Sequence, residues 1–163
     1  MKNILPASDP DSAPVHCEPN PRHRILVVED DAAVRRVNTE ILICSGYQVD
    51  AAEDGAVAWD ALQLKEYDLM VTDNDMPRVT GVELIQKVQA AGMALPVIMA
   101  TGALPEFPRH GSRQPAVTLL KPYTVHELLS AVKKVLCAAS DSLEEIAPSS
   151  KWQIQPLSER FQP

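Results

Sequence analysis

The chain has 163 residues, of which 45% are hydrophobic, so its length fits a single domain with enough apolar residues for a sizeable core. Its formal net charge is −7 and its basic residues form no run, which argues against direct binding to nucleic acid. No apolar stretch reaches the roughly 18 residues of a membrane-spanning helix, and prolines and charges interrupt the start of the chain, which argues against a signal peptide.

Residues 1–22 contain five prolines separated by small and polar residues, a composition typical of a disordered arm. From residue 23 onward, short apolar runs alternate with helical patterns. We expect strands at residues 25–28, 47–51, 68–72, 97–100 and 116–120, and helices at residues 32–44, 56–65, 82–91 and 125 to about 139. This alternation predicts right-handed crossovers and a parallel sheet covered by helices on both faces.

Two segments depart from this alternation. Between the fourth and fifth strands, Pro105, Pro108 and Pro115 predict a helix that is short or absent. The last helix keeps apolar residues at helical spacing until Pro148 prevents continuation, so we expect it to run long. We therefore divide the chain into an arm at residues 1–22, a domain at residues 23–139 and a partly helical extension at residues 140–163.

Polar side chains of different kinds follow four of the predicted strands. In chain order they are Glu29 with Asp30 and Asp31, then Asp73, Thr101 and Lys121. Because ligands of open α/β sheets bind outside the carboxyl ends of the strands, we expect these side chains to lie together. Carboxylates suit a hard divalent cation, whereas a hydroxyl and a lysine suit the oxygens of a phosphoryl group.

Each of these residues alone has a plainer interpretation. Asp30 or Asp31 could cap the helix that follows, and Asp73 could belong to a turn. Thr101 alone would be a strand-end hydroxyl, and Lys121 alone a solvated charge. Taken together, four strand ends with complementary chemistry favour a common site.

The three cysteines, Cys17, Cys44 and Cys137, lie far apart and lack the spacing of metal ligands. They indicate reduced, mostly buried thiols in a cytoplasmic protein. The four histidines likewise show no ligand spacing, so we expect them to be solvated or to pack.

Five segments give residues 23–139 a resemblance to the receiver domain of two-component response regulators. They are RILVVEDDAAVRRV (24–37), AAEDGAVAWDAL (51–62), YDLMVTDNDMPRVTGVEL (67–84), LPVIMATG (95–102) and LLKPYT (119–124). The resemblance implies a flavodoxin-like α/β fold with a five-stranded parallel sheet of order 2-1-3-4-5. The degraded fourth helix is similar to that of a subgroup of single-domain receivers.

The resemblance also implies roles for individual residues. Asp73 corresponds to the phosphoacceptor, and Thr101 and Lys121 correspond to the residues that contact the phosphoryl oxygens. An aspartate can attack a phosphoryl group only if a cation neutralises the repulsion between the two anions.

The resemblance supplies such a cation, Mg²⁺ or Mn²⁺. Its ligands would be Glu29, Asp30 and Asp73, with the backbone carbonyl of Asp75. Thr118 stands where many receivers carry Tyr or Phe, so an aromatic-coupled switch is not expected. The bond between Lys121 and Pro122 is a candidate cis peptide.

We therefore expect a stand-alone cytoplasmic receiver that is not an enzyme, has no membrane association and acts through a downstream protein. Its phosphodonor would be a histidine kinase or a histidine phosphotransfer protein. The apolar stripe from Leu128 to Ile146, with the tail beyond it, is the predicted docking or homodimer surface. Two alternatives stay open: a haloacid-dehalogenase-like phosphatase using Asp73 and Asp75, and a pseudo-receiver that is not phosphorylated.

Overall fold

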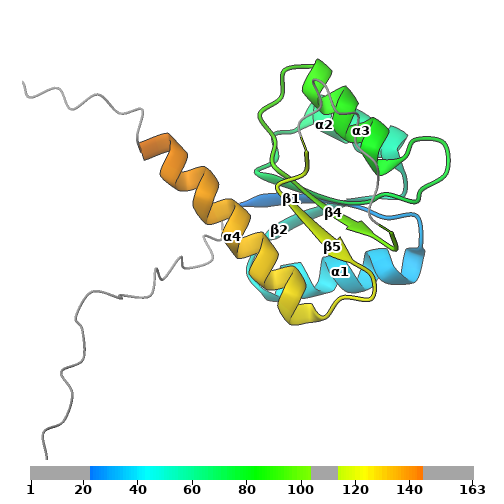
Figure 1. Ribbon diagram of the computed structural model, residues 1–163, viewed down its shortest axis with the longest axis horizontal. Coiled ribbons are helices and arrows are strands. Elements are labelled where there is room, and N and C mark those ends of the chain that lie inside the picture. Colours follow the sequence, from blue (N-terminus) through cyan, green and yellow to red (C-terminus); the bar gives the residue numbers. More distant parts are fainter. Residues whose placement is uncertain (1–22, 104–113, 145–163) are drawn as a thin grey trace, which may run out of the picture.

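A five-stranded, all-parallel sheet forms the centre of the molecule. The structure is a computed structural model and describes residues 23–103 and 114–144 (Figure 1). The strands are β1 (Arg24–Val28), β2 (Gln48–Ala52), β3 (Leu69–Asp73), β4 (Val97–Thr101) and β5 (Val117–Leu120). Their order is β2-β1-β3-β4-β5, as the resemblance implied, and every neighbouring pair is parallel. All five carboxyl ends therefore lie at one edge of the sheet.

Four helices cover the sheet: α1 (Ala32–Cys44), α2 (Gly55–Leu64), α3 (Gly81–Ala90) and α4 (Val125–Glu144). Side-chain caps define where they begin. Asp31 caps α1 and Asp54 caps α2, while Thr80 and Glu83 form a capping box at α3. Each capping residue follows a loop that begins at the carboxyl end of a strand. The caps therefore fix where these loops end and the helices begin.

The two faces of the sheet carry separate hydrophobic cores. Figure 1 shows α1 and α4 on one face and α2 and α3 on the other. Alternate strand residues divide accordingly: Ile25, Val27 and Val71 pack on the α1/α4 side, and Leu26 and Met70 on the α2/α3 side. The predicted doubly covered sheet is confirmed.

The apolar stripe of the last helix has a different role from the one predicted. Leu128, Val132 and Val135 are buried against the sheet, so this part of the stripe is core and not a docking or dimer surface. An amphipathic helix presents the same spacing whether it packs on its own sheet or on a partner. The helix does run past residue 139, to Glu144.

Parts of the predicted organisation lie outside the described residues. These are the arm at residues 1–22, residues 145–163 of the extension, and residues 104–113 of the crossover between β4 and β5. The described ends of that crossover, residues 102–103 and 114–116, are not helical. Within the described ranges, no helix is long and apolar enough to cross a membrane.

The cysteines differ in part from the expectation of mostly buried thiols. Cys44 is free but exposed, because it lies on the solvent side of the last turn of α1. Cys137, on α4, is half-buried. Cys17 lies outside the described residues.

Candidate functional site

Three carboxylates meet at the carboxyl edge of the sheet. β1 and β3 are neighbours, with Val28 opposite Thr72, so the residues that end these strands come together. Oxygens of Glu29, Asp30 and Asp73 all lie within 4.8 Å of one another. Glu29 and Asp73 are only 3% and 6% exposed, whereas Asp30 is exposed. An all-oxygen cluster open on one side is the donor set that suits a hard divalent cation.

The neighbouring aspartates have different roles. Asp31 caps α1, because its Oδ1 accepts hydrogen bonds from the N–H groups of Ala33 and Val34 at 2.8 and 2.9 Å. Arg35 donates from Nη1 to the backbone carbonyl oxygens of Glu29 and Asp30, at 2.7 and 3.1 Å. The cap and the arginine fix the turn after β1. The plain capping interpretation therefore holds for Asp31, and Asp30 belongs to the acid cluster.

Lys121 reaches the same cluster from the end of β5. Its Nζ lies 2.7 Å from Asp73 Oδ2 and 3.0 Å from Glu29 Oε2. Its backbone N–H donates to the carbonyl of Thr101 at 2.8 Å, and the peptide bond to Pro122 is cis, as predicted. The ammonium thus bridges the two buried carboxylates.

Burial and charge shift the proton affinities of this group. Burial raises the pKa of Glu29 to about 7, opposed by the hydrogen bond from Lys121 and reinforced by the charge of Asp73. Burial alone lowers the pKa of Lys121, but its hydrogen bonds to Asp73 and Glu29 outweigh that effect and raise it. The carboxylates therefore repel one another, and one ammonium offsets this only in part.

Thr101 belongs to the same edge, but its hydroxyl is engaged elsewhere. Thr101 Oγ1 donates to the carbonyl of Ala103 at 2.6 Å and accepts from the Ala103 N–H at 3.3 Å. Thr118 is half-buried within β5, and its register partner on the neighbouring strand β4 is Met99. Of the predicted polar set, the acids and Lys121 are in contact, whereas the Thr101 hydroxyl bonds its own loop.

Asp75 lies in the loop that follows Asp73. Its backbone N–H donates to Asp73 Oδ1 at 3.2 Å, and its exposed carboxylate accepts from Asn74 Nδ2 at 3.1 Å. The backbone of Asp75 is thus tied to the carboxylate of Asp73. Its side chain faces a neighbouring amide instead.

Two features of the site were missed by reasoning from the sequence. A Cβ at Gly81 would stand 2.3 Å from the carbonyl oxygen of Asp73, so only glycine fits there. Arg78, in the same loop, pairs with the buried carboxylate of Asp54. The sequence did contain an indication of the role of Gly81, because this glycine stands directly before the predicted helix at residues 82–91, in the segment that follows Asp73. The pairing of Arg78 had no such indication, because 24 residues separate the partners.

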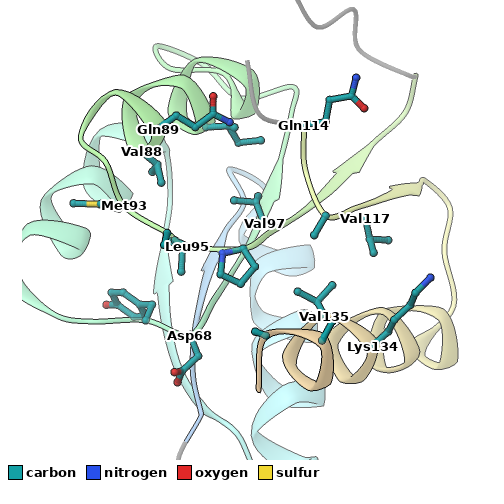
Figure 2. A pocket seen from close by; sticks show the side chains of 17 residues that line it. Asp68, Val88, Gln89, Met93, Leu95, Val97, Gln114, Val117, Lys134 and Val135 are labelled. Carbon is teal, nitrogen blue, oxygen red and sulfur yellow. The ribbon is translucent and has the colours of Figure 1, made fainter. Parts of the chain in front are cut away.

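A cavity lies at the opposite edge of the sheet. It has a volume of about 700 Å³ and is lined by residues before β3, β4 and β5 and by α3 and α4 (Figure 2). Val88, Leu95, Val117 and Val135 give it an apolar wall. The acid cluster and this cavity are therefore separate features.

The proteins that this chain resembles are consistent with the geometry of the site. A family model described as "Response regulator receiver domain" matches residues 25–133. The chain is 33% identical over 118 residues to the response regulator receiver protein CpdR of Brucella abortus, covering 71% of this chain and 98% of CpdR. It is 33% identical over 137 residues to the response regulator RppA of Synechocystis, covering 82% of this chain but only 58% of RppA.

Solved structures give the same assignment. The response regulator TrrA of Thermotoga maritima, in complex with Mg(2+)-BeF, is 29% identical with a TM-score of 0.63, covering 69% of this chain and 98% of TrrA. The receiver domain of the hybrid histidine kinase CckA is 34% identical with a TM-score of 0.58, at the same coverage. These matches give no support to the phosphatase alternative. The chain belongs to the family of response regulator receiver domains.

Proposed function

We propose that Asp73 is the phosphoacceptor of this receiver domain. The phosphoryl group would come from a phosphohistidine of a histidine kinase or a histidine phosphotransfer protein. The observation that carries the proposal is that Asp73 belongs to the acid cluster and also contacts Lys121 Nζ at 2.7 Å. A carboxylate that gains a phosphoryl group needs positive charge on both sides of the developing anion. Lys121 can supply this charge on one side, and a cation held by the acid cluster can supply it on the other.

The acid cluster would hold Mg²⁺, with Mn²⁺ as a second hard cation that fits the same ligands. Glu29, Asp30 and Asp73 would supply carboxylate oxygens, and Asp75 its backbone carbonyl. Support comes from the proximity of the three carboxylates and from the Mg(2+)-BeF complex of the similar protein TrrA. When bound, the ion would neutralise the repulsion between the aspartate and the incoming phosphoryl oxygens.

The chain's own residues would do the following during transfer. An oxygen of Asp73 forms a bond to phosphorus while the bond from phosphorus to the donor imidazole nitrogen breaks, and that nitrogen keeps the electron pair. Lys121 exchanges one carboxylate contact for a phosphoryl oxygen. Thr101 leaves the carbonyl of Ala103 and donates its hydroxyl to a second phosphoryl oxygen.

The output of the phosphorylated domain would be contact with a downstream protein. We propose that it acts in the cytoplasm as a signalling protein, not as an enzyme with a substrate of its own. A homodimer through the last helix could involve only surfaces other than the buried stripe of Leu128, Val132 and Val135. Residues 140–163 are the other segment proposed to take part.

Intact mass spectrometry after incubation with acetyl phosphate and Mg²⁺ tests the proposal. The wild-type chain should gain one acid-stable, base-labile phosphoryl adduct, and Asp73→Asn should gain none. Asp60→Asn is a matched control, because it removes an exposed carboxylate on α2. Labelling of Asp73→Asn at the wild-type rate would refute the assignment, and a wild-type chain that is never labelled would favour the pseudo-receiver.

A further inference from the structure

The loop between β3 and α3 rests on the first turn of α2. Asp54, the N-cap of α2, is 0% exposed. Its Oδ1 accepts from the N–H groups of Ala56 and Val57 at 2.7 and 2.9 Å, and its Oδ2 accepts from Arg78 Nη2. One buried carboxylate therefore both starts a helix and holds a residue of the loop that follows Asp73.

A second contact lies beside the first. A Cβ at Gly55 would stand 2.7 Å from Cγ1 of Val79 and 3.0 Å from its carbonyl oxygen. The loop thus presses directly against the backbone of α2. The first residue of that helix must be glycine for this approach to occur.

The loop is also fixed at the end nearer the acid cluster. The Gly81 N–H donates to the carbonyl of Asn74 at 3.1 Å, and the Asp75 N–H donates to Asp73 Oδ1 at 3.2 Å. Between these points, Arg78 adopts a φ of 70°, a left-handed conformation that costs a non-glycine residue on the order of 1 kcal/mol. The surrounding contacts must hold Arg78 there, and its pairing with Asp54 is one of them.

We propose that Asp54 and Arg78 are positioning residues for the cation site, because they hold the loop that carries Asp75 at a fixed distance from Asp73. This inference rests on one part of the proposed function, namely that the acid cluster binds a cation. The guanidinium of Arg78 is largely exposed, so its removal should leave the fold intact.

The direction of the change in Mg²⁺ affinity distinguishes a positioning role of Arg78 from a direct effect of its charge. Removing a cation from the neighbourhood of a cation site should tighten Mg²⁺ binding if only Coulomb repulsion matters. Loosening the loop should weaken Mg²⁺ binding instead, because the Asp75 carbonyl would no longer be held in place. The two explanations therefore predict opposite changes.

Isothermal titration of the full chain with MgCl₂ alone measures this change. Arg78→Gln replaces the guanidinium with a shorter, uncharged polar side chain, and should weaken Mg²⁺ binding on the order of ten-fold, as loss of an outer partner of a metal ligand typically does. Arg36→Gln is the control, because it also removes an exposed guanidinium from an ion pair, with Glu40 on α1. It should leave the affinity unchanged.

A second readout reports the loop itself. Hydrogen exchange at residues 74–80 should speed up in Arg78→Gln and stay unchanged in Arg36→Gln. Unchanged or tighter Mg²⁺ binding in Arg78→Gln would overturn the inference, even if the melting temperature falls. Failure of phosphorylation in the wild-type chain would refute the proposed function without altering this affinity ratio, so the two failures can be told apart.

Discussion

The hydroxyl of Thr101, the last residue of β4, donates a 2.6 Å hydrogen bond to the carbonyl of Ala103, two residues further along the chain. A single bond thus ties the end of β4 to the start of the crossover that follows. If this hydroxyl turns to a phosphoryl group on Asp73, the bond to Ala103 must break. Phosphorylation and the conformation of this loop are then linked through one rotatable side chain.

Hydrogen exchange with and without beryllofluoride and Mg²⁺ tests this link. We expect the largest change in peptides that cover residues 102–115, because Thr118 has no aromatic ring to carry the movement elsewhere. Thr101→Ala should abolish that change and still bind beryllofluoride, since Lys121 and the acids are retained. A response confined to the neighbourhood of Asp73 in the wild-type chain would indicate a relay of phosphoryl groups instead of a switch.

Asp30→Asn should raise the melting temperature in metal-free buffer and weaken Mg²⁺ binding. The substitution removes one of three mutually repelling carboxylates but leaves the cap of α1 in place, because Asp31 makes the capping bonds. Asp31→Ala is the contrasting variant and should lower the melting temperature. A loss of stability in Asp30→Asn would mean that this residue supports the helix after all.

The pH dependence of the free energy of unfolding should reflect the raised pKa of Glu29. Its pKa is 4.5 in the unfolded chain and about 7 in the folded one, so the folded state binds more protons between these values. The free energy of unfolding should therefore rise as the pH falls from 7 toward 4.5, by roughly 1–3 kcal/mol. Urea denaturation in EDTA at pH 5.5 and 8 measures this, and Glu29→Gln should flatten the difference.

Below that range the trend should reverse. The hydrogen bond from the Val57 N–H, joined by that from Ala56 and by Arg78, lowers the pKa of Asp54 below its ordinary 3.8. The folded state therefore binds fewer protons than the unfolded one at such pH values, and this stabilisation is lost as the pH falls through the folded pKa. A free energy of unfolding that rises steadily down to pH 3 would contradict the stabilisation of the charged Asp54 carboxylate by these hydrogen bonds.

Asp75→Asn should change the lifetime of the phosphoryl group. The exposed carboxylate of Asp75 stands two residues after Asp73 and can act on a water that approaches the phosphoryl group, either by orienting it or by repelling its developing negative charge. We expect a change in half-life in one direction or the other, followed by mass spectrometry after removal of the donor. Equal half-lives in the two proteins would refute a role for this side chain.

The sequence predicted those parts of the molecule that depend on patterns of residues close together in the chain. Continuous apolar runs located the strands, and the polar residues that end them located Glu29, Asp73 and Lys121 at one edge. The long-range pairing of Asp54 with Arg78 depends on how two loops meet, which no local pattern contains. The bond from Thr101 to Ala103 depends on a side-chain rotamer, and the same residue in another rotamer would give the same sequence pattern.

The cavity between α3 and α4 lies at the amino ends of β3, β4 and β5, whereas Asp73 lies at the carboxyl end of β3. A small molecule that filled this cavity would leave the approach of a phosphodonor unobstructed. Screens for ligands of this protein that read inhibition of phosphoryl transfer would pass over such a compound. A thermal-shift screen would detect it, because binding to the folded state raises the melting temperature wherever the ligand sits.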